Sequence, residues 1–436
     1  MGQKNQGKKE SFVYYGRGGG RLGFEIPAKW NVLTQFEPAE SPAVPDVLQE
    51  ARRALDNPIG TPRIEEMAKP GKAVILFDDL NRQTPSHLAF PEILNRLNAA
   101  GIKDGDITAI CAVGSHPVVD EDGFKLKLGE EAYKRLSPRV MNHDCTSEEN
   151  VIIGRTSRGC LVEINPFVYQ AEFVVGIGSA MPHLMSGFGG GTKIIMPGIS
   201  SFQAILEHHT KWLANPKARL GLLEGNYCLE EQNEHSMMAG FHFKLDFAMN
   251  VRDEVFKAYA GDPIQVTRAA GKDLIREYGS HVPRRADVVI TGTYPMDRGV
   301  QALKGLFPAV LAAKTGGHII MVGRQSLFQQ FIPLVPELNS RKTSAQETRL
   351  LMQGEVNPIA KVAGVSAWLS VVGIKSIKER FKVTYVSEDL SRSDVESIGF
   401  DYAASVEEAL KRIDRDMPEA DVIVYPAGSI TIPILG

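Results

Sequence analysis

A glycine-rich stretch, HLMSGFGGGTKIIMPG at residues 183–198, combines a histidine, four glycines and a lysine within eleven residues. Glycine-rich runs that end in lysine are typical of loops that bind phosphate. A Walker A loop, however, needs a second glycine before the lysine and a hydroxyl residue after it, and these places hold Thr192 and Ile194. The stretch therefore disfavours a magnesium-nucleotide kinase. A phosphate presented differently from that of ATP still fits, because amides without a neighbouring Cβ allow close approach. The glycines concerned are Gly187, Gly189, Gly190 and Gly191.

Three of the ten histidines lie at the ends of predicted strands or beside this loop: His116, His183 and His209. The segment 198–209 predicts a helix capped by Ser200, and its apolar stripe continues to His209. His209 is therefore expected to face inward, with His208 turned about 100° away. A single inward histidine is more often a hydrogen-bonded core residue. Three that converge near a glycine loop and a lysine indicate general acid–base groups with a metal ligand.

Two further segments carry polar groups at positions that favour ligand binding. Asp78 and Asp79 end a predicted strand, with Arg82 three residues on. They predict either a helix N-cap with a surface ion pair, or an arginine that binds a carboxylate or phosphate with two hydrogen bonds. Gln301 and Lys304 share one face of a predicted helix, although a solvated helix face has the same pattern.

Short apolar runs alternate with helical stretches such as 87–101. These predicted strands and helices must position the candidate site residues. The predicted strands are 72–79, 107–116 and 171–178, and then 286–292, 317–323, 381–387 and 420–428. This alternation predicts an α/β protein with mainly parallel sheets covered by helices. The region 230–282 reads as mixed helix without a clear strand, and residues 11–27 predict a hairpin with turn glycines.

With 436 residues the chain is too long for one core, which predicts two α/β domains facing across a central cleft. We expect an N-terminal cofactor-binding domain with the histidines at 1–280. A C-terminal domain at 285–436 is expected to close the substrate site, and its last segment is also compatible with packing back on the first domain.

The composition excludes several classes of protein. Apolar residues make up 43% and charged residues 23%, and the net charge of −3 gives no basic surface for nucleic acid. The four cysteines are scattered without a CxxC pair, as expected in a reducing compartment. The polar start lacks the apolar core of a signal peptide, and no apolar run approaches the roughly 20 residues that span a bilayer. We therefore expect a cytoplasmic protein without membrane contact.

Four blocks of the chain together resemble the nickel-dependent lactate racemase family. They are DDLNRQTP at 78–85, AVGSHP at 112–117, NHDC at 142–145, and PHLMSGFGGGTKIIMPGI with the EHH that follows, at 182–209. Members of this family bind a nickel-pincer nucleotide, a pyridinium bisthiocarboxylic acid mononucleotide that holds nickel. The resemblance implies that Lys193 is covalently attached to this cofactor and that His209 is the protein ligand of nickel. It also implies that His116 and His183 are the acid–base pair.

The resemblance assigns further residues to the cofactor and the substrate. The implied cofactor contacts are Lys193, Asp78, Asp79, Arg82, Gly189, Gly190 and Gly191. The implied substrate contacts are Arg82, Gln301, Lys304 and Trp368. The implied partners are a small-molecule 2-hydroxy acid and, transiently, the enzymes that synthesise the cofactor.

The resemblance implies a racemase or epimerase of 2-hydroxy acids that works by hydride transfer to the pyridinium ring and back. Three positions depart from the family pattern: Thr192 and Pro117 stand where arginine is usual, and Val300 where the lactate enzymes have tyrosine. These departures remove charge and a hydroxyl near the substrate, so we expect a substrate other than lactate. The alternatives are an oxidoreductase that releases the keto acid and a non-catalytic protein that binds the nickel nucleotide.

Overall fold

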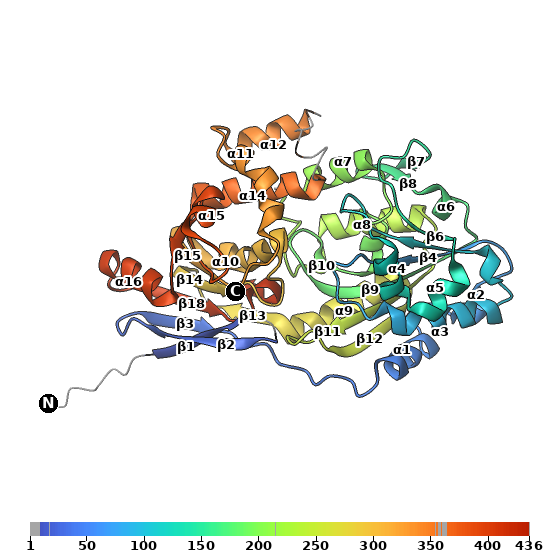
Figure 1. The fold of residues 1–436 in the computed structure, drawn as a ribbon, viewed down its shortest axis with the longest axis horizontal. Helices are drawn as coiled ribbons and strands as arrows, with labels where there is room; N and C mark the ends of the chain where they lie inside the picture. Colours follow the sequence, from blue (N-terminus) through green and yellow to red (C-terminus); the bar gives the residue numbers. More distant parts are fainter. Residues whose placement is uncertain are drawn as a thin grey trace. The chain divides into compact units, whose positions relative to one another are not determined.

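The computed structural model describes residues 9–16, 18–213, 215–353, 355, 359 and 364–435. The chain divides into two compact units (Figure 1). One unit is Ser41–Ile275, and the other combines Met1–Glu40 with Arg276–Gly436. In the described part of the chain, no helix is both long and apolar enough to cross a membrane.

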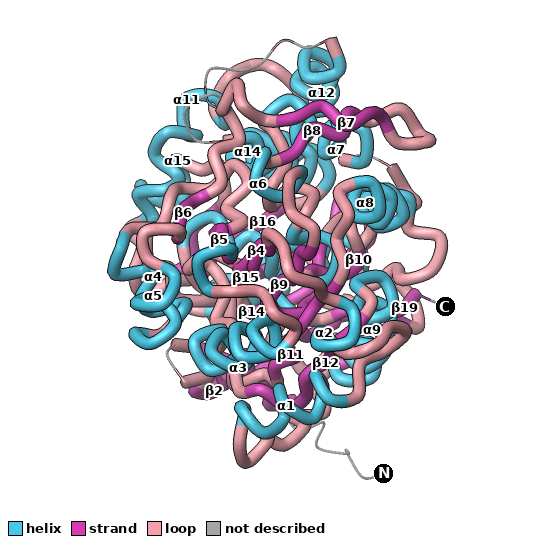
Figure 2. The backbone as a smooth tube through the Cα atoms, turned by 90° about the vertical axis from the view of Figure 1, so that its right-hand side faces the viewer, coloured by secondary structure: helices cyan, strands magenta, loops and turns pink. Residues whose placement is uncertain are grey.

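The unit Ser41–Ile275 is built on a sheet with the strand order β12-β11-β9-β4-β5-β6. Its strands are β4 (Ala73–Phe77), β5 (Ile107–Cys111), β6 (Val140–Asn142), β9 (Phe173–His183), β11 (Phe243–Met249) and β12 (Val255–Gly261). The pairs from β11 to β6 are parallel, whereas β12 and the short β10 (Gly187–Gly189) run antiparallel to their neighbours. Figure 2 shows β6, β5, β4 and β9 in this order across the sheet.

Successive side chains of these strands pack into two different cores, because side chains alternate between the faces of a sheet. On one face Ile75 and Phe77 pack with residues of α1 (Val47–Asp56) and α3 (Ser86–Ala99). On the other face Val74 and Leu76 pack with the glycine-loop residue Ile194. The further helices are α2 (Ile64–Met67), α4 (Glu121–Leu128), α5 (Glu130–Leu136), α6 (Pro166–Tyr169), α7 (Phe202–Trp212), α8 (Tyr227–Met238) and α9 (Pro263–Tyr278). A hairpin of β7 (Val151–Arg155) and β8 (Leu161–Ile164) adds to the second face.

The other unit holds a parallel sheet with the strand order β17-β16-β15-β14-β18-β3. Its strands are β3 (Asn31–Gln35), β14 (Ala286–Gly292), β15 (Ala313–Val322), β16 (Lys382–Val386), β17 (Asp401–Ala403) and β18 (Asp421–Tyr425). A hairpin of β1 (Lys9–Tyr15) and β2 (Gly20–Ile26) and the pair β13 (Gly279–Val282) and β19 (Ile432–Leu435) complete the strands. The helices are α10 (Leu306–Ala312), α11 (Val335–Leu338), α12 (Ser344–Met352), α14 (Val365–Arg380), α15 (Arg392–Ser397) and α16 (Val406–Asp416).

The structure confirms the predicted α/β class, the mainly parallel sheets and the N-terminal hairpin. The division of the chain differs from the predicted 1–280 and 285–436. Strand β3 pairs in parallel with β18, so the first 40 residues belong with the C-terminal part (Figure 1, blue beside red). The last strand, β19, pairs in parallel with β13 of the same unit.

The prediction for 230–282 was wrong, because this region contains three strands, β11, β12 and β13, and the long helix α9. Strand β11 has the sequence FKLDFAM, in which Lys244 and Asp246 interrupt the apolar run although both are fully buried. Their side chains form an ion pair, which lets the strand bury two charges.

Candidate functional site

The carboxyl ends of three neighbouring parallel strands bring the first candidate residues to one edge of the sheet. Asp79 follows β4, His116 lies in the loop after β5, and His183 is the last residue of β9. Ligand sites of parallel α/β sheets typically lie at this edge. All three residues, and also Lys193 and His209, belong to the unit Ser41–Ile275.

His116 is oriented by the carboxylate of Asp79. Its Nδ1 lies 2.7 Å from Oδ2 of Asp79, and the backbone N–H of Asn81 donates to Oδ1 at 2.9 Å. Burial raises the pKa of Asp79, but the hydrogen bond and charge of His116 and the charge of Arg82 bring that pKa well below its usual range. An ionised Asp79 accepts a hydrogen bond from Nδ1–H of His116, so that Nε2 is the ring nitrogen at which this histidine can exchange a proton.

His183 is held by a serine. Its Nδ1 accepts a hydrogen bond from the backbone N–H of Ser186 at 3.2 Å and lies 3.0 Å from the Ser186 hydroxyl. The short strand β10 turns back on β9, so that Gly187 pairs directly with His183. When the ring is protonated, its Nδ1–H can donate to the serine hydroxyl, and the proton on Nε2 is then the one that the ring can give up.

Lys193 lies in a 3₁₀ turn, Gly191–Ile194, beside Arg82, Asp79 and Cys228. The pKa of its amine is lowered to about 8, chiefly by burial and also by the charge of Arg82, while Cys228 and Asp79 act in the opposite direction. A lysine with this pKa carries a useful fraction of neutral, nucleophilic amine near neutral pH. The residue is therefore suited to covalent attachment.

Labelling of the Lys193 amine should follow this lowered pKa. Because only the neutral amine reacts, acetylation of Lys193 should rise with pH and level off above about pH 8. A free lysine analogue, with a pKa of about 10.4, should still become more reactive above pH 10. Peptide mass spectrometry after brief treatment with acetic anhydride at a series of pH values measures both. A Lys193 midpoint equal to that of the analogue would contradict the assignment.

His209 presents the form of imidazole that binds metals. Its Nδ1 lies 3.0 Å from the carbonyl oxygen of Ile205, one turn earlier in α7, so Nδ1–H donates and Nε2 keeps a lone pair. Burial, the charge of Lys193 and that of His116 lower the pKa of His209 to about 3, so that the ring is neutral. Among the described residues, no group of three His, Cys, Asp or Glu side chains is arranged to hold a metal.

Two details of α7 differ from expectation. The helix is capped by Ser201, whose hydroxyl accepts from the backbone N–H of Ala204, whereas the Ser200 hydroxyl donates to the carbonyl of Ile195. His208 is as buried as His209, because α8 covers that side of α7. Its ring packs edge-on against His235, and its Nε2 lies 3.9 Å from Sγ of Cys228.

His143, in the NHDC block, holds the start of α7 and was not singled out from the sequence. It is buried, its Nε2 donates to the carbonyl of Ser200 at 2.9 Å, and its Nδ1 accepts from the amide of Asn165 at 3.2 Å. Burial lowers its pKa despite the bond to Ser200, so the ring is neutral. This explains why the block lies near the site without a reactive group: it positions the helix that carries His209.

The glycines of the loop are needed mainly for packing. The backbone N–H of Gly191 donates to Oδ2 of Asp246 at 2.5 Å, so this amide is already occupied. A Cβ on Gly190 would lie 2.7 Å from the same oxygen, and one on Gly191 would lie 1.7 Å from Oγ1 of Thr267; both glycines have positive φ. Gly189 differs, because a Cβ there would make only ordinary contacts, 3.4 Å from Cγ of Met181 and 4.0 Å from Cδ of Lys193.

Asp78 anchors its own loop. Its Oδ1 pairs with the Nζ of Lys127 at 2.8 Å, and its Oδ2 accepts from the hydroxyl of Thr84. Lys127 also donates to the carbonyl of Arg82 at 2.8 Å. Asp78 is thus bonded within the protein, and the side chains of Asp79 and Arg82 are the ones that the loop presents to the site.

The remaining candidates lie in the unit that contains Arg276–Gly436. Gln301 and Lys304 occupy a 3₁₀ helix, Gly299–Gly305, and Trp368 lies on α14 with 1% of its surface exposed. The Oε1 of Gln301 and the Nε1 of Trp368 are buried and have no hydrogen-bond partner among the described residues. Because leaving a buried polar atom unpaired is costly, such atoms are suited to hydrogen bonds with a ligand.

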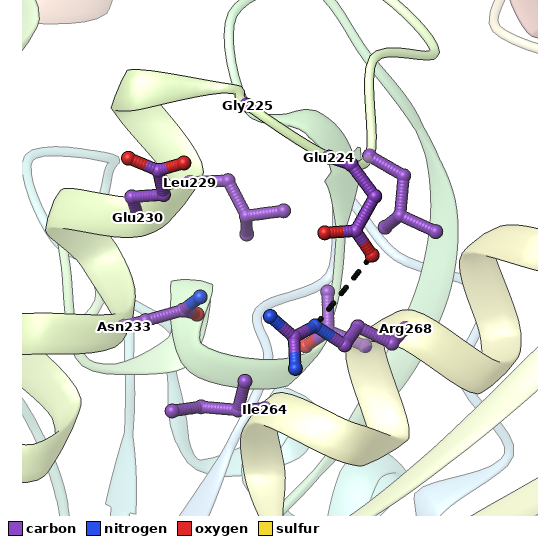
Figure 3. Close-up of a pocket in the computed structure, with 9 residues that line it drawn as sticks. Glu224, Gly225, Leu229, Glu230, Asn233, Ile264 and Arg268 are labelled. Atoms are coloured by element: carbon purple, nitrogen blue, oxygen red, sulfur yellow. Dashed lines mark ion pairs between the residues drawn. The ribbon is translucent and has the colours of Figure 1, made fainter.

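A small pocket of about 30 Å³ lies between α8 and α9 (Figure 3). Glu224 and Arg268 face each other across it at 3.8 Å. Asn233, also in its wall, accepts a hydrogen bond from the Thr192 hydroxyl at 2.9 Å, which places the pocket on the outer side of the glycine loop. The pocket has room for about one water and contains none of the candidate residues.

Comparison with known proteins places these residues in a family. Residues 15–221 match the lactate racemase N-terminal domain, and residues 282–432 match the lactate racemase C-terminal domain. A lactate racemase from Thermoanaerobacterium thermosaccharolyticum is 33% identical over 276 residues, 62% of this chain and 64% of the relative. A lactate racemase from Lactiplantibacillus plantarum is 30% identical over 281 residues, 63% of this chain and 65% of the relative. The aligned region thus spans just under two thirds of both relatives.

Solved structures share the fold. The lactate racemase apoprotein from Thermoanaerobacterium thermosaccharolyticum superimposes with a TM-score of 0.83 at 24% identity, covering 97% of this chain and 100% of that one. A protein from Thermotoga maritima superimposes with a TM-score of 0.63 at 18% identity, covering 92% and 100%. The two domain matches follow one another and together extend over most of the chain, which therefore belongs to the lactate racemase family.

Proposed function

We propose that the protein is a racemase or epimerase of 2-hydroxy acids that carries a nickel-pincer nucleotide on Lys193. The observation that supports this most is the clustering of complementary groups in one unit: the Asp79–His116 pair, a lysine with a lowered pKa, and a neutral buried His209. Lys193 interacts electrostatically with Arg82 and Asp79, and His209 with Lys193 and His116, so these groups lie within reach of one another.

The residues present fit this cofactor. Lys193 would form the covalent link, the lone pair on Nε2 of His209 would bind nickel, and Gly189 would lie against the attached chain. When bound, the cofactor supplies a pyridinium ring that accepts a hydride, which avoids forming a carbanion next to a carboxylate. We also propose that the enzymes that synthesise the cofactor are transient partners.

One histidine removes the proton of the substrate hydroxyl as a base, and the other returns a proton as an acid. Nε2 of His116 takes the proton from the substrate hydroxyl as the Cα hydrogen leaves, and the 2-keto acid that results is planar. Nε2 of His183 returns a proton to the oxygen when the hydrogen is delivered to the opposite face, which inverts the centre. Arg82 would bind the substrate carboxylate with two hydrogen bonds. We retain Gln301, Lys304 and Trp368 as proposed substrate contacts.

The substrate is proposed to be a 2-hydroxy acid other than lactate, either a larger one or a sugar acid epimerised at C2. Thr192, at a position where arginine is usual in the family, directs its hydroxyl to Asn233 and not toward Lys193. Pro117 adds no charge beside His116, and the next residue, Val118, leaves 74% of its surface exposed. The lack of a charged side chain at position 117, followed by an exposed apolar residue, favours a substrate with more bulk than a methyl group.

Nuclear magnetic resonance of single enantiomers in D₂O tests the function. The loaded protein is incubated with a panel of chiral 2-hydroxy acids. We expect racemisation of at least one acid with its Cα hydrogen retained, because the hydride returns without exchange with water. Accumulation of keto acid would identify an oxidoreductase instead, and extensive deuterium at Cα would indicate proton abstraction. No turnover of any acid would favour a binding protein.

Replacing Asp79 with asparagine should slow racemisation by about 10²- to 10⁴-fold without loss of the attached cofactor. The asparagine amide can donate to Nδ1 of His116, which favours the tautomer that carries its proton on Nε2, the wrong atom. Measurement of kcat for each enantiomer, with intact mass as the control for attachment, checks this. A rate close to that of the unchanged protein would show that Asp79 does not set the tautomer.

A further inference from the structure

Four charged side chains, three of them buried and the fourth, Asp78, partly buried, form a row of two ion pairs in the unit Ser41–Ile275. Lys127 pairs with Asp78 at 2.8 Å, and Lys244 pairs with Asp246 at 2.9 Å. Lys244 and Asp246 expose 1% and 0% of their side chains, and Lys127 exposes 4%. These residues come from α4, from the end of β4 and from β11, and β9 lies between the two strands.

Gly178 on β9 makes room for the row. A Cβ at this position would lie 2.6 Å from the Nζ of Lys244, 3.2 Å from Oδ1 of Asp246 and 3.6 Å from Oδ2 of Asp78. The ammonium of Lys244 and the carboxylates of both aspartates therefore surround one point, which a side chain on β9 would fill. The two pairs are therefore neighbours across Gly178.

Each end of the row is bonded to the backbone of a loop that carries a site residue. At one end Oδ2 of Asp246 accepts from the N–H of Gly191, the first residue of the turn that holds Lys193. At the other end the Nζ of Lys127 donates to the carbonyl of Arg82. Buried ion pairs contribute little net stability compared with apolar residues of similar volume, so stability alone is a weak reason for three buried charges and a partly buried one here.

We propose that Asp246, balanced by Lys244, is a positioning residue for Lys193. Its carboxylate fixes the N–H of Gly191 and lies against Cα of Gly190, and the N–H of Lys193 in turn donates to the carbonyl of Gly190 at 3.0 Å. The turn is thereby held at its first residue, and the Lys193 side chain leaves it in one direction. The inference rests on the proposed function in one respect only, that Lys193 is the attachment residue.

Two double variants separate the effect of the hydrogen bond that Asp246 accepts from Gly191, here called the anchor, from the effect of the charge balance between Asp246 and Lys244. Lys244→Met with Asp246→Asn removes both charges but keeps an oxygen that can accept from Gly191. Lys244→Met with Asp246→Ala removes both charges and the acceptor. Amide hydrogen exchange of the peptide spanning 187–196 in the cofactor-free protein reports on the turn, and intact mass during incubation with the cofactor reports on attachment. Thermal unfolding of both variants serves as the folding control.

Relative to the asparagine variant, we expect the alanine variant to exchange its loop amides faster. We also expect it to attach the cofactor more slowly, by a factor on the order of ten. Equal exchange and equal attachment in the two variants would overturn the proposal. If the unchanged protein does not attach the cofactor, the proposed function fails, whereas the exchange comparison still tests the anchor. If neither double variant folds, Gly178→Ala, which displaces the Lys244 ammonium without removing a charge, replaces them. Unaltered loop exchange in that variant would then overturn the proposal.

Discussion

Replacement of Lys193 with alanine is expected to yield a folded protein that carries no covalent nucleotide and racemises no 2-hydroxy acid above the buffer rate. The loss should be about 10⁴-fold or more, because the hydride acceptor is supplied by the cofactor and no side chain can replace it. Intact-mass measurement after production together with the cofactor-synthesis enzymes, combined with a polarimetric assay, measures both effects.

The matched control for this experiment is His209→Ala. That variant should keep the covalent adduct and lose nickel, because His209 contributes a metal ligand and no bond to the nucleotide. Metal analysis by mass spectrometry separates the two variants. An adduct of unchanged mass in Lys193→Ala would place the attachment elsewhere and remove the proposed mechanism.

Replacement of His116 or of His183 with alanine should each reduce racemisation by about 10²- to 10⁴-fold. Each face of the planar keto acid needs its own proton carrier, so neither histidine can substitute for the other. Because the equilibrium constant between enantiomers is one, kcat/KM should fall by the same factor in both directions. Kinetic assays that start from each enantiomer check this.

A single turnover distinguishes the two variants. With His116 removed, only the enantiomer whose hydroxyl faces His183 should still release its hydroxyl proton and form keto acid. With His183 removed, the opposite enantiomer should do so. Rapid quenching and mass detection of the keto acid measure this preference. Loss of the same enantiomer in both variants would refute the two-histidine scheme.

The sequence predicted the parts of the site that depend on local rules. The strands β4 and β9 were visible as the apolar runs 72–79 and 171–178, although β9 continues to His183, and the helical period placed His209 on the buried face of α7. Periodicity was insufficient for His208, because it cannot show that a second helix, α8, covers the adjacent face.

The parts that escaped prediction depend on long-range pairing. Lys244 and Asp246 make the buried strand β11 hard to recognise from its sequence pattern. Each charge can be buried only because it forms an ion pair with the other. Strand β3 finds its partner near Asp421, and the hydrogen bond from Asn31 to that residue spans 390 positions. The sequence also could not show why positions 190 and 191 require glycine. The side chains that would clash with a Cβ there, Asp246 and Thr267, are distant in sequence.

The pairing of β3 with β18 also bears on how the chain reaches its fold during synthesis. Residues 41–275 contain all the strands of their own sheet, so that unit can fold once it has left the ribosome. Strand β3 is made earlier, yet its neighbour β18 begins at Asp421, close to the C-terminus. The hydrogen bonds of β3 to β18 can therefore form only after the intervening chain, which includes all of residues 41–275, has been synthesised.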